Sequence, residues 1–151
     1  MNLYLLIKWI HIISASILFG TGVGTAFFML KAHLSGNAEA FRVTTRHVVT
    51  ADWLFTAPAV VVQAVTGLWL TAHLGIPMDS AWFKWVAGLY IFVGACWIPV
   101  VLIQVRIRNA LATGSRTDNC EGLMRAWFVL GIFAFAAVLA LYYLMVFKPG
   151  I

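Results

Sequence analysis

Charged residues are scarce in this chain: Asp, Glu, Lys and Arg make up 10% of its 151 residues, against roughly 25% in a soluble domain. Hydrophobic residues make up 63%, and the mean hydropathy is +0.95. So few charges exclude the large water-facing surface of a soluble domain, whereas lipid can solvate a chain of this composition. We therefore predict an integral membrane protein.

Cysteine is also rare, with single residues at Cys96 and Cys120, and the sequence holds no CxxC, CxxCH or HExxH motif. It holds no glycine-rich phosphate loop after a strand and no long basic soluble face, so nucleotide and nucleic-acid binding are not expected. The net charge of +5 is instead attributed to membrane topology and to contact with anionic lipid.

Long apolar runs, by contrast, are abundant. Four of them reach the length of about 20 residues that a helix needs to cross a bilayer; they cover residues 3–30, 48–72, 82–105 and 123–147. Because the backbone in lipid must satisfy its own hydrogen bonds, each run predicts a helix. The connections, expected at residues 33–46, 75–80 and 106–121, are short, which favours an antiparallel bundle. We predict an all-α, four-helix membrane protein with one domain, residues 1–151.

The basic residues are distributed unevenly between the two sides of this bundle. Seven of the ten flank the first or the third connection; they are Lys31, Arg42, Arg46, Arg106, Arg108, Arg116 and Arg125. Basic residues favour the cytoplasmic side, so the N-terminus and the C-terminus are expected outside. In the inner membrane of a bacterium, the expected location, the outer side is the periplasm.

Polar residues recur along one face of the second apolar run. The spacings alternate between four and three; the positions are Asp52, Thr56, Ala59, Gln63, Thr66, Leu70 and His73. Polar groups inside a membrane usually face the bundle interior or a functional site. Two interpretations stay open for the seam of Asp52, Thr56, Gln63 and Thr66: hydrogen bonding between helices, or a path for a cofactor or for protons.

The first run carries His11, with small residues after it. Ser16, Gly20 and Gly24 form a ladder at intervals of four, which lets another helix approach closely, within one chain or between two copies. Small residues near a histidine leave room for a flat group such as a porphyrin, but they also simply allow tight packing. Haem in helical bundles is commonly held by histidines on facing helices, so His11 is considered both as an axial ligand and as a packing residue.

The segment LIKWIHIISASILFGTGVGTAFFMLKAH resembles the first helix of the HemJ-type protoporphyrinogen oxidases. These are four-helix, haem-binding inner-membrane proteins in a wider group that includes the CopD-like copper-resistance proteins. The residues that carry the resemblance along the chain are Lys8, His11, Gly20, His33, Pro58, Ala59, Gly67, Leu68, Trp82, Lys148 and Pro149. The resemblance implies that His11 is a haem ligand. A lysine and a histidine of that family's third helix are replaced by Val86 and Trp97, which implies a relative in another bacterial family of the group.

We therefore expect haem b in the outer half of the bundle, serving electron transfer or oxidation of a membrane or porphyrin substrate, with a membrane redox partner. The expected cofactor-binding residues are His11, His73, Lys84 and Lys8. His11 is the first axial ligand; His73 and Lys84 compete for the second position, which is otherwise open. Whether the protein is an enzyme and whether it forms a homo-oligomer are left open. The alternative function is a non-catalytic accessory or assembly protein with a polar packing seam, and a small transporter is the weaker third.

Overall fold

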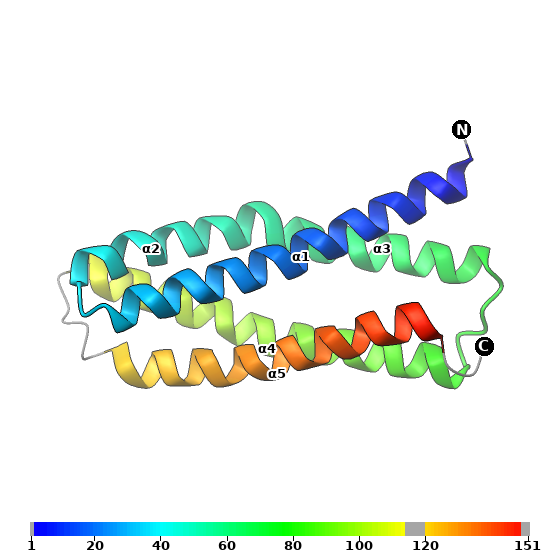
Figure 1. The fold of residues 1–151 in the computed structure, drawn as a ribbon. Helices are drawn as coiled ribbons and strands as arrows, with labels where there is room; N and C mark the ends of the chain where they lie inside the picture. Colours follow the sequence, from blue (N-terminus) through cyan, green and yellow to red (C-terminus); the bar gives the residue numbers. More distant parts are fainter. Residues whose placement is uncertain (1, 114–119, 149–151) are drawn as a thin grey trace.

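The computed structural model describes residues 2–113 and 120–148, and all regular secondary structure in this part of the chain is helical (Figure 1). The elements in chain order are α1 (Leu3–Leu34), α2 (Ala38–Ala51), the π-helix η1 (Asp52–Thr56), α3 (Ala57–His73), α4 (Ala81–Ala112) and α5 (Glu121–Phe147). Since α2, η1 and α3 continue into one another, the described residues form four helices long and apolar enough to cross a membrane. The prediction of an all-α, four-helix membrane bundle is confirmed.

The first connection is much shorter than the sequence suggested. The expected connection at residues 33–46 is reduced to residues 35–37, where Gly36 adopts a positive φ of 67°. The Asn37 side chain then accepts a hydrogen bond of 2.9 Å from the backbone N–H of Ala40, which caps the start of α2. The polar composition of α2 concealed its buried face, which packs inside the bundle and consists of Phe41, Thr45, Val48 and Val49.

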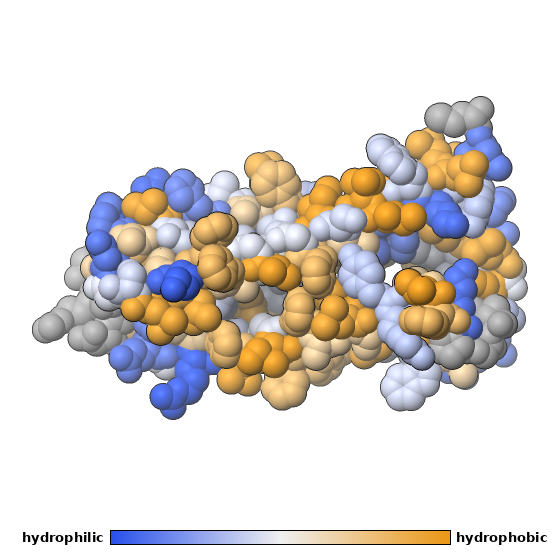
Figure 2. Space-filling view, viewed as in Figure 1, coloured by the Kyte–Doolittle hydropathy of each residue, from blue (hydrophilic) through white to orange (hydrophobic). Residues whose placement is uncertain are grey.

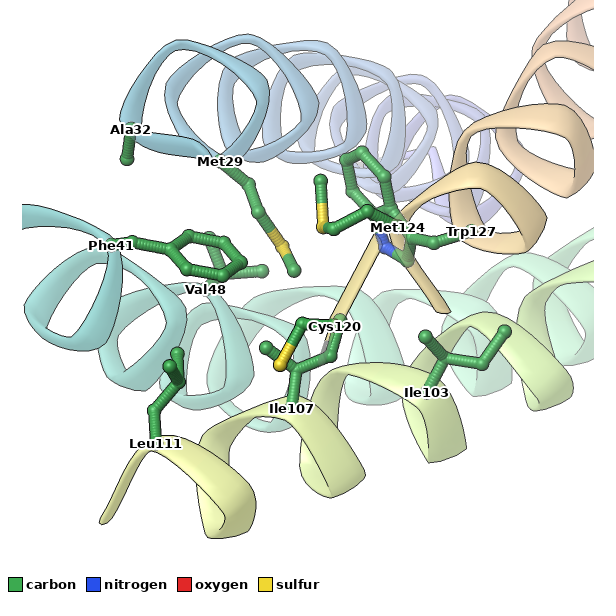
Figure 3. Packing of buried hydrophobic residues seen from close by; sticks show 10 residues of the cluster. All are labelled: Met29, Ala32, Phe41, Val48, Ile103, Ile107, Leu111, Cys120, Met124 and Trp127. Atoms are coloured by element: carbon green, nitrogen blue, oxygen red, sulfur yellow. The ribbon is translucent and has the colours of Figure 1, made fainter. Parts of the chain in front are cut away.

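The ends of the bundle differ in packing. A core cluster of buried residues lies where α1 and α4 end and α5 begins, shown in Figure 3; it contains Met29, Ala32, Phe41, Val48, Ile103, Ile107, Leu111, Cys120, Met124 and Trp127. We call this the core end, and the opposite end, which carries both chain termini, the terminal end (Figure 1). The outer surface between the two ends is largely apolar, and hydrophilic residues gather toward the ends (Figure 2).

The helices associate mainly as pairs. α4 packs along α5, while α1 packs on α2 and α3, and α2 also contacts α4. Toward the terminal end, the α1/α3 pair and the α4/α5 pair diverge (Figure 1), and the space-filling surface is hollowed between them (Figure 2). Few bonds join the pairs there; one is donated by the hydroxyl of Tyr90 on α4 to the carbonyl of Val60 on α3, at 2.7 Å.

The ladder of small residues on α1 does not hold another helix of this chain. A Cβ atom added at Gly20 or Gly24 would meet no described atom within 4 Å, and Ser16 is exposed. Ser16 instead donates its hydroxyl hydrogen to the carbonyl of Ile12 in its own helix, at 3.0 Å. The close approach expected at this ladder is therefore not made within the described chain.

A π-helical turn interrupts the second span. The backbone N–H of Ala57 bonds to the carbonyl of Asp52, five residues earlier, instead of four. Pro58 follows directly, and it has no N–H to offer the carbonyl four residues before it, which its ring also crowds. Such a wide turn contains an extra residue, so the helix beyond it is rotated by about 100° relative to an uninterrupted α-helix. This rotation decides which neighbours the polar face of the span meets.

Candidate functional site

His11 belongs to α1, and its half-buried ring lies against α3. Both nitrogen atoms of the ring are within hydrogen-bonding distance of side chains of α3. Nδ1 lies 2.8 Å from Oγ1 of Thr66, and Nε2 lies 3.1 Å from the amide nitrogen of Gln63. Ser14, one turn along α1, is buried, and its hydroxyl lies within hydrogen-bonding distance of the His11 carbonyl, at 2.9 Å, and of Oε1 of Gln63. We call His11, Ser14, Gln63 and Thr66 the histidine cluster.

The hydrogen bonds of this cluster define one neutral tautomer of the ring. The amide nitrogen of Gln63 can only donate, so Nε2 of His11 accepts. Nδ1 then carries the proton and donates it to the hydroxyl oxygen of Thr66. That hydroxyl donates onward to the carbonyl of Val62, at 2.6 Å. A neutral imidazole with an accepting Nε2 is also the form that can donate an electron pair to a metal.

Helix spacing explains why α3 can surround the ring. Gln63, Thr66 and Gly67 stand at i, i+3 and i+4, so they share one face of the helix. Gly67 has no side chain, which allows the imidazole to lie directly on the α3 backbone. Neither Ser14 nor Gly67 was among the site residues expected from the sequence. The available signal was their position on the same faces as His11 and Gln63, three and four residues further along the chain.

His73 belongs to a different cluster, at the terminal end. Its ring stacks on Trp69, with 4.7 Å between ring centroids and 9° between planes, and on Tyr4 of α1, with 5.5 Å and 20°. The ammonium nitrogen of Lys8 lies 5.7 Å from the centroid of the Tyr4 ring, within the range of a cation–π contact. The structure thus places two of the expected cofactor residues, Lys8 and His73, in an aromatic cluster on the exposed end of the α1/α3 pair.

The expected second ligands are therefore not brought to His11. His73 is the last residue of α3 and lies seven residues beyond Thr66, which is about 10 Å along a helix that rises 1.5 Å per residue. Lys84 is exposed in the first turn of α4. Of the four expected cofactor-binding residues, only His11 belongs to the histidine cluster.

The polar residues of the second span divide between two neighbours. Gln63 and Thr66 face α1, as described above. Asp52 and Thr56 are the buried first and last residues of the π-turn, where Oγ1 of Thr56 donates to Oδ1 of Asp52 at 2.9 Å. The side chain of Gln104, from α4, lies beside the same carboxyl. We call Asp52, Thr56 and Gln104 the aspartate cluster; the rotation introduced by the π-turn accounts for its separation from the histidine cluster.

A small apolar groove of about 250 Å³, open to the outside, lies between α1 and the η1–α3 segment. Its lining is Trp9, Ile10, Ile13, Ser14, Ile17, Leu54, Phe55, Pro58, Ala59 and Val62. Ser14 is the member of the histidine cluster that reaches it. Its volume lies just below the range of roughly 300–1,000 Å³ that is usual for small-molecule sites. Its apolar lining suits a hydrocarbon group. Within residues 2–113 and 120–148, no group of three or more His, Cys, Asp or Glu side chains is placed to hold a metal ion.

The sequence of the chain matches a known family of membrane proteins. A family model described as "Predicted integral membrane protein (DUF2269)" matches residues 5–149. This match includes nearly all of the chain and reaches all four spans. No curated protein matches the chain, and no solved structure matches it.

Proposed function

The chain belongs to the DUF2269 family of predicted integral membrane proteins, and from this premise we propose that it binds haem b in the inner membrane of a bacterium, with His11 as an axial ligand. The location in a lipid bilayer follows from the family and from the four spans. The haem is proposed from the geometry around His11 and from the resemblance of the first helix to that of the HemJ-type oxidases.

The observation that carries this proposal is the bond between Nδ1 of His11 and Oγ1 of Thr66, at 2.8 Å. Histidines that bind metals almost always donate their second ring N–H to a nearby acceptor, which fixes the tautomer and the ring orientation. Thr66 supplies that acceptor and leaves Nε2 as the atom for iron. Nε2 is met by the amide of Gln63, a neutral group on a flexible side chain that must rotate away for iron to bind.

The haem that we propose has one protein ligand, His11. His73 and Lys84 lie away from His11, so we propose an open sixth position on the iron. A haem with an open position supplies electron exchange or oxidation of a membrane or porphyrin substrate, and a membrane redox partner would exchange electrons with it. In this arrangement His11 holds the iron through Nε2, Thr66 orients the imidazole, and Gln63 lies next to the bound group.

One observation favours the alternative, a non-catalytic accessory or assembly protein: both ring nitrogens of His11 already have partners within the protein. In that case the histidine cluster holds α1 against α3, and each of its bonds contributes about 0.6 kcal/mol, the average found for polar bonds between membrane helices.

The absorption spectrum of the purified protein, expressed with added haem and recorded oxidised and then reduced, decides between these functions. We expect a Soret band with α and β bands that sharpen on reduction. His11→Ala should remove or shift these bands, because iron loses its imidazole. His47→Ala is the matched control, since His47 is exposed on α2, and it should leave the spectrum unchanged.

A wild-type protein without haem, or an unchanged spectrum in His11→Ala, would contradict the proposal and favour the accessory function. His73→Ala and Lys84→Ala should also leave the spectrum unchanged. A spectral shift in either variant would show that the mutated residue is the second ligand and that the iron has no open position.

Gln63→Ala provides an independent comparison. If His11 binds haem, removal of the amide frees Nε2 and haem content increases. If the cluster only packs helices, Gln63→Ala lowers the stability of the protein and has no effect on haem content.

A further inference from the structure

Asp52 is the buried acidic side chain of the described chain. It is 5% exposed, whereas Glu39, Asp79 and Glu121, the other acidic residues within the described ranges, are all exposed. It lies inside the second span, with α3 continuing toward one side of the bundle and α2 toward the other. A carboxyl group at such a position is costly unless something compensates it.

The surroundings of Asp52 satisfy the two oxygens of its carboxyl unequally. Oδ1 accepts the hydrogen bond from Thr56, at 2.9 Å. Oδ2 is fully buried and has no hydrogen-bond partner among the described residues. Gln104, which is 2% exposed, lies close enough for its amide nitrogen to donate a weak hydrogen bond to the carboxyl, while its Oε1 has no partner in the described part of the chain. Two unpartnered acceptor oxygens therefore belong to adjacent buried side chains.

No basic side chain of residues 2–113 and 120–148 forms an ion pair with Asp52. The ion pair that the neighbouring helix does make joins Arg42 to Glu39 at 2.6 Å, on its exposed face. An ionised carboxylate that is buried without a counter-charge takes up a proton rather than remain charged. Protonation removes this charge and gives the buried carboxyl a hydrogen-bond donor of its own.

From these contacts we propose that Asp52, Thr56 and Gln104 form an intramembrane proton-binding site. Oδ2 of Asp52 takes up one proton, and the carboxylate loses its charge. Thr56 continues to donate to Oδ1, and Gln104 lines the site from α4. The site is separate from the histidine cluster and needs no haem, so it extends beyond the proposed function.

The π-turn at residues 52–56 is the element that creates this site. Asp52, at the start of the turn, lies beside Gln104 of α4, whereas Gln63 and Thr66, beyond the turn, face α1. Single π-turns inside α-helices frequently occur at functional sites. Because Oδ2 is closed off from solvent, exchange of the proton requires the packing of the helices around Asp52 to open, and we expect this exchange to be slow.

Infrared spectroscopy of the full chain in bilayers at neutral pH tests this proposal directly. We expect the carbonyl stretching band of a protonated carboxylic acid in the wild type, with a slow shift after transfer into D2O. Asp52→Asn, which keeps the shape of the side chain, should abolish the band. Asp79→Asn, an exposed control of the same type, should keep it. Gln104→Leu should move the band, because an amide next to the acid is replaced by hydrocarbon.

The absence of the band in the wild type would show an ionised Asp52 and overturn the proposal. Persistence of the band in Asp52→Asn would assign it to another residue, with the same consequence. A wild-type band that disappears when potassium chloride is replaced by sodium chloride would indicate a sodium site and would also overturn the assignment of a proton.

Discussion

Gly67 on α3 lies directly against the imidazole of His11 on α1: a Cβ atom at Gly67 would lie 3.2 Å from Cε1 of His11. This distance is shorter than ordinary van der Waals contact. The missing side chain therefore sets how closely α1 approaches α3, and the same approach places Nδ1 of His11 at hydrogen-bonding distance from Thr66.

Gly67→Val should displace the ring and separate the two helices, since its methyl groups need the space that His11 occupies. Overpacking of this kind costs about 1–3 kcal/mol, and thermal unfolding in detergent should show the loss. Gly88→Val is the control, because a Cβ at Gly88 meets nothing within 4 Å. Equal destabilisation by both variants would show that the close contact between Gly67 and His11 does not determine the loss of stability.

Tyr90→Phe should loosen the connection between the two helix pairs. The Tyr90 hydroxyl donates to the carbonyl of Val60 at 2.7 Å, and such a bond contributes about 0.5–1.5 kcal/mol to stability. Tyr143→Phe is the matched control, since the Tyr143 side chain is exposed and its hydroxyl makes no hydrogen bond with the described residues. Chemical unfolding of both variants measures the difference; no loss in Tyr90→Phe would show that the bond is dispensable.

Phe41→Ala should be severely destabilising. Phe41 is 1% exposed within the core cluster, and truncation of a buried phenylalanine to alanine costs about 3–5 kcal/mol. Phe133→Ala removes the same atoms from a side chain that is 57% exposed on α5, where lipid replaces the lost contacts, so its effect should be small. Unfolding in a graded detergent mixture compares the free energies of unfolding of the two variants. Similar losses of stability would contradict the conclusion that Phe41 is packed inside the protein and Phe133 is not.

Reporter fusions should place the core end of the bundle in the cytoplasm. A fusion at Asn37, or at Ser115, which lies outside the described residues, should report the cytoplasm. Fusions at Met78 and at the C-terminus should report the periplasm. The reason is the position of seven of the ten basic residues beside the first and third connections. The opposite pattern would move His11 to the cytoplasmic half and contradict the predicted position of the haem in the outer half.

The sequence by itself determined the fold class, because the hydropathy and the length of each apolar run can be read directly from it. In lipid, a single span can satisfy its own backbone hydrogen bonds only as a helix. It also drew attention to His11, Asp52, Gln63 and Thr66, since polar groups are costly in lipid and therefore stand out. The sequence indicated α2 less well: a segment with Arg42 and Arg46 resembles a connection until its buried face is known.

Only the tertiary structure decided which residues meet. An unbroken α-helix would keep Asp52 and Gln63 on one stripe, but the π-turn before Pro58 directs the former toward α4 and the latter toward His11. His73 shares the face predicted for the seam, yet it stacks on Trp69 at the end of the helix and lies too far along the axis to join His11. Such pairings depend on helix rotation and on contacts between segments distant in the chain, and neither quantity is contained in the spacing of residues along one helix.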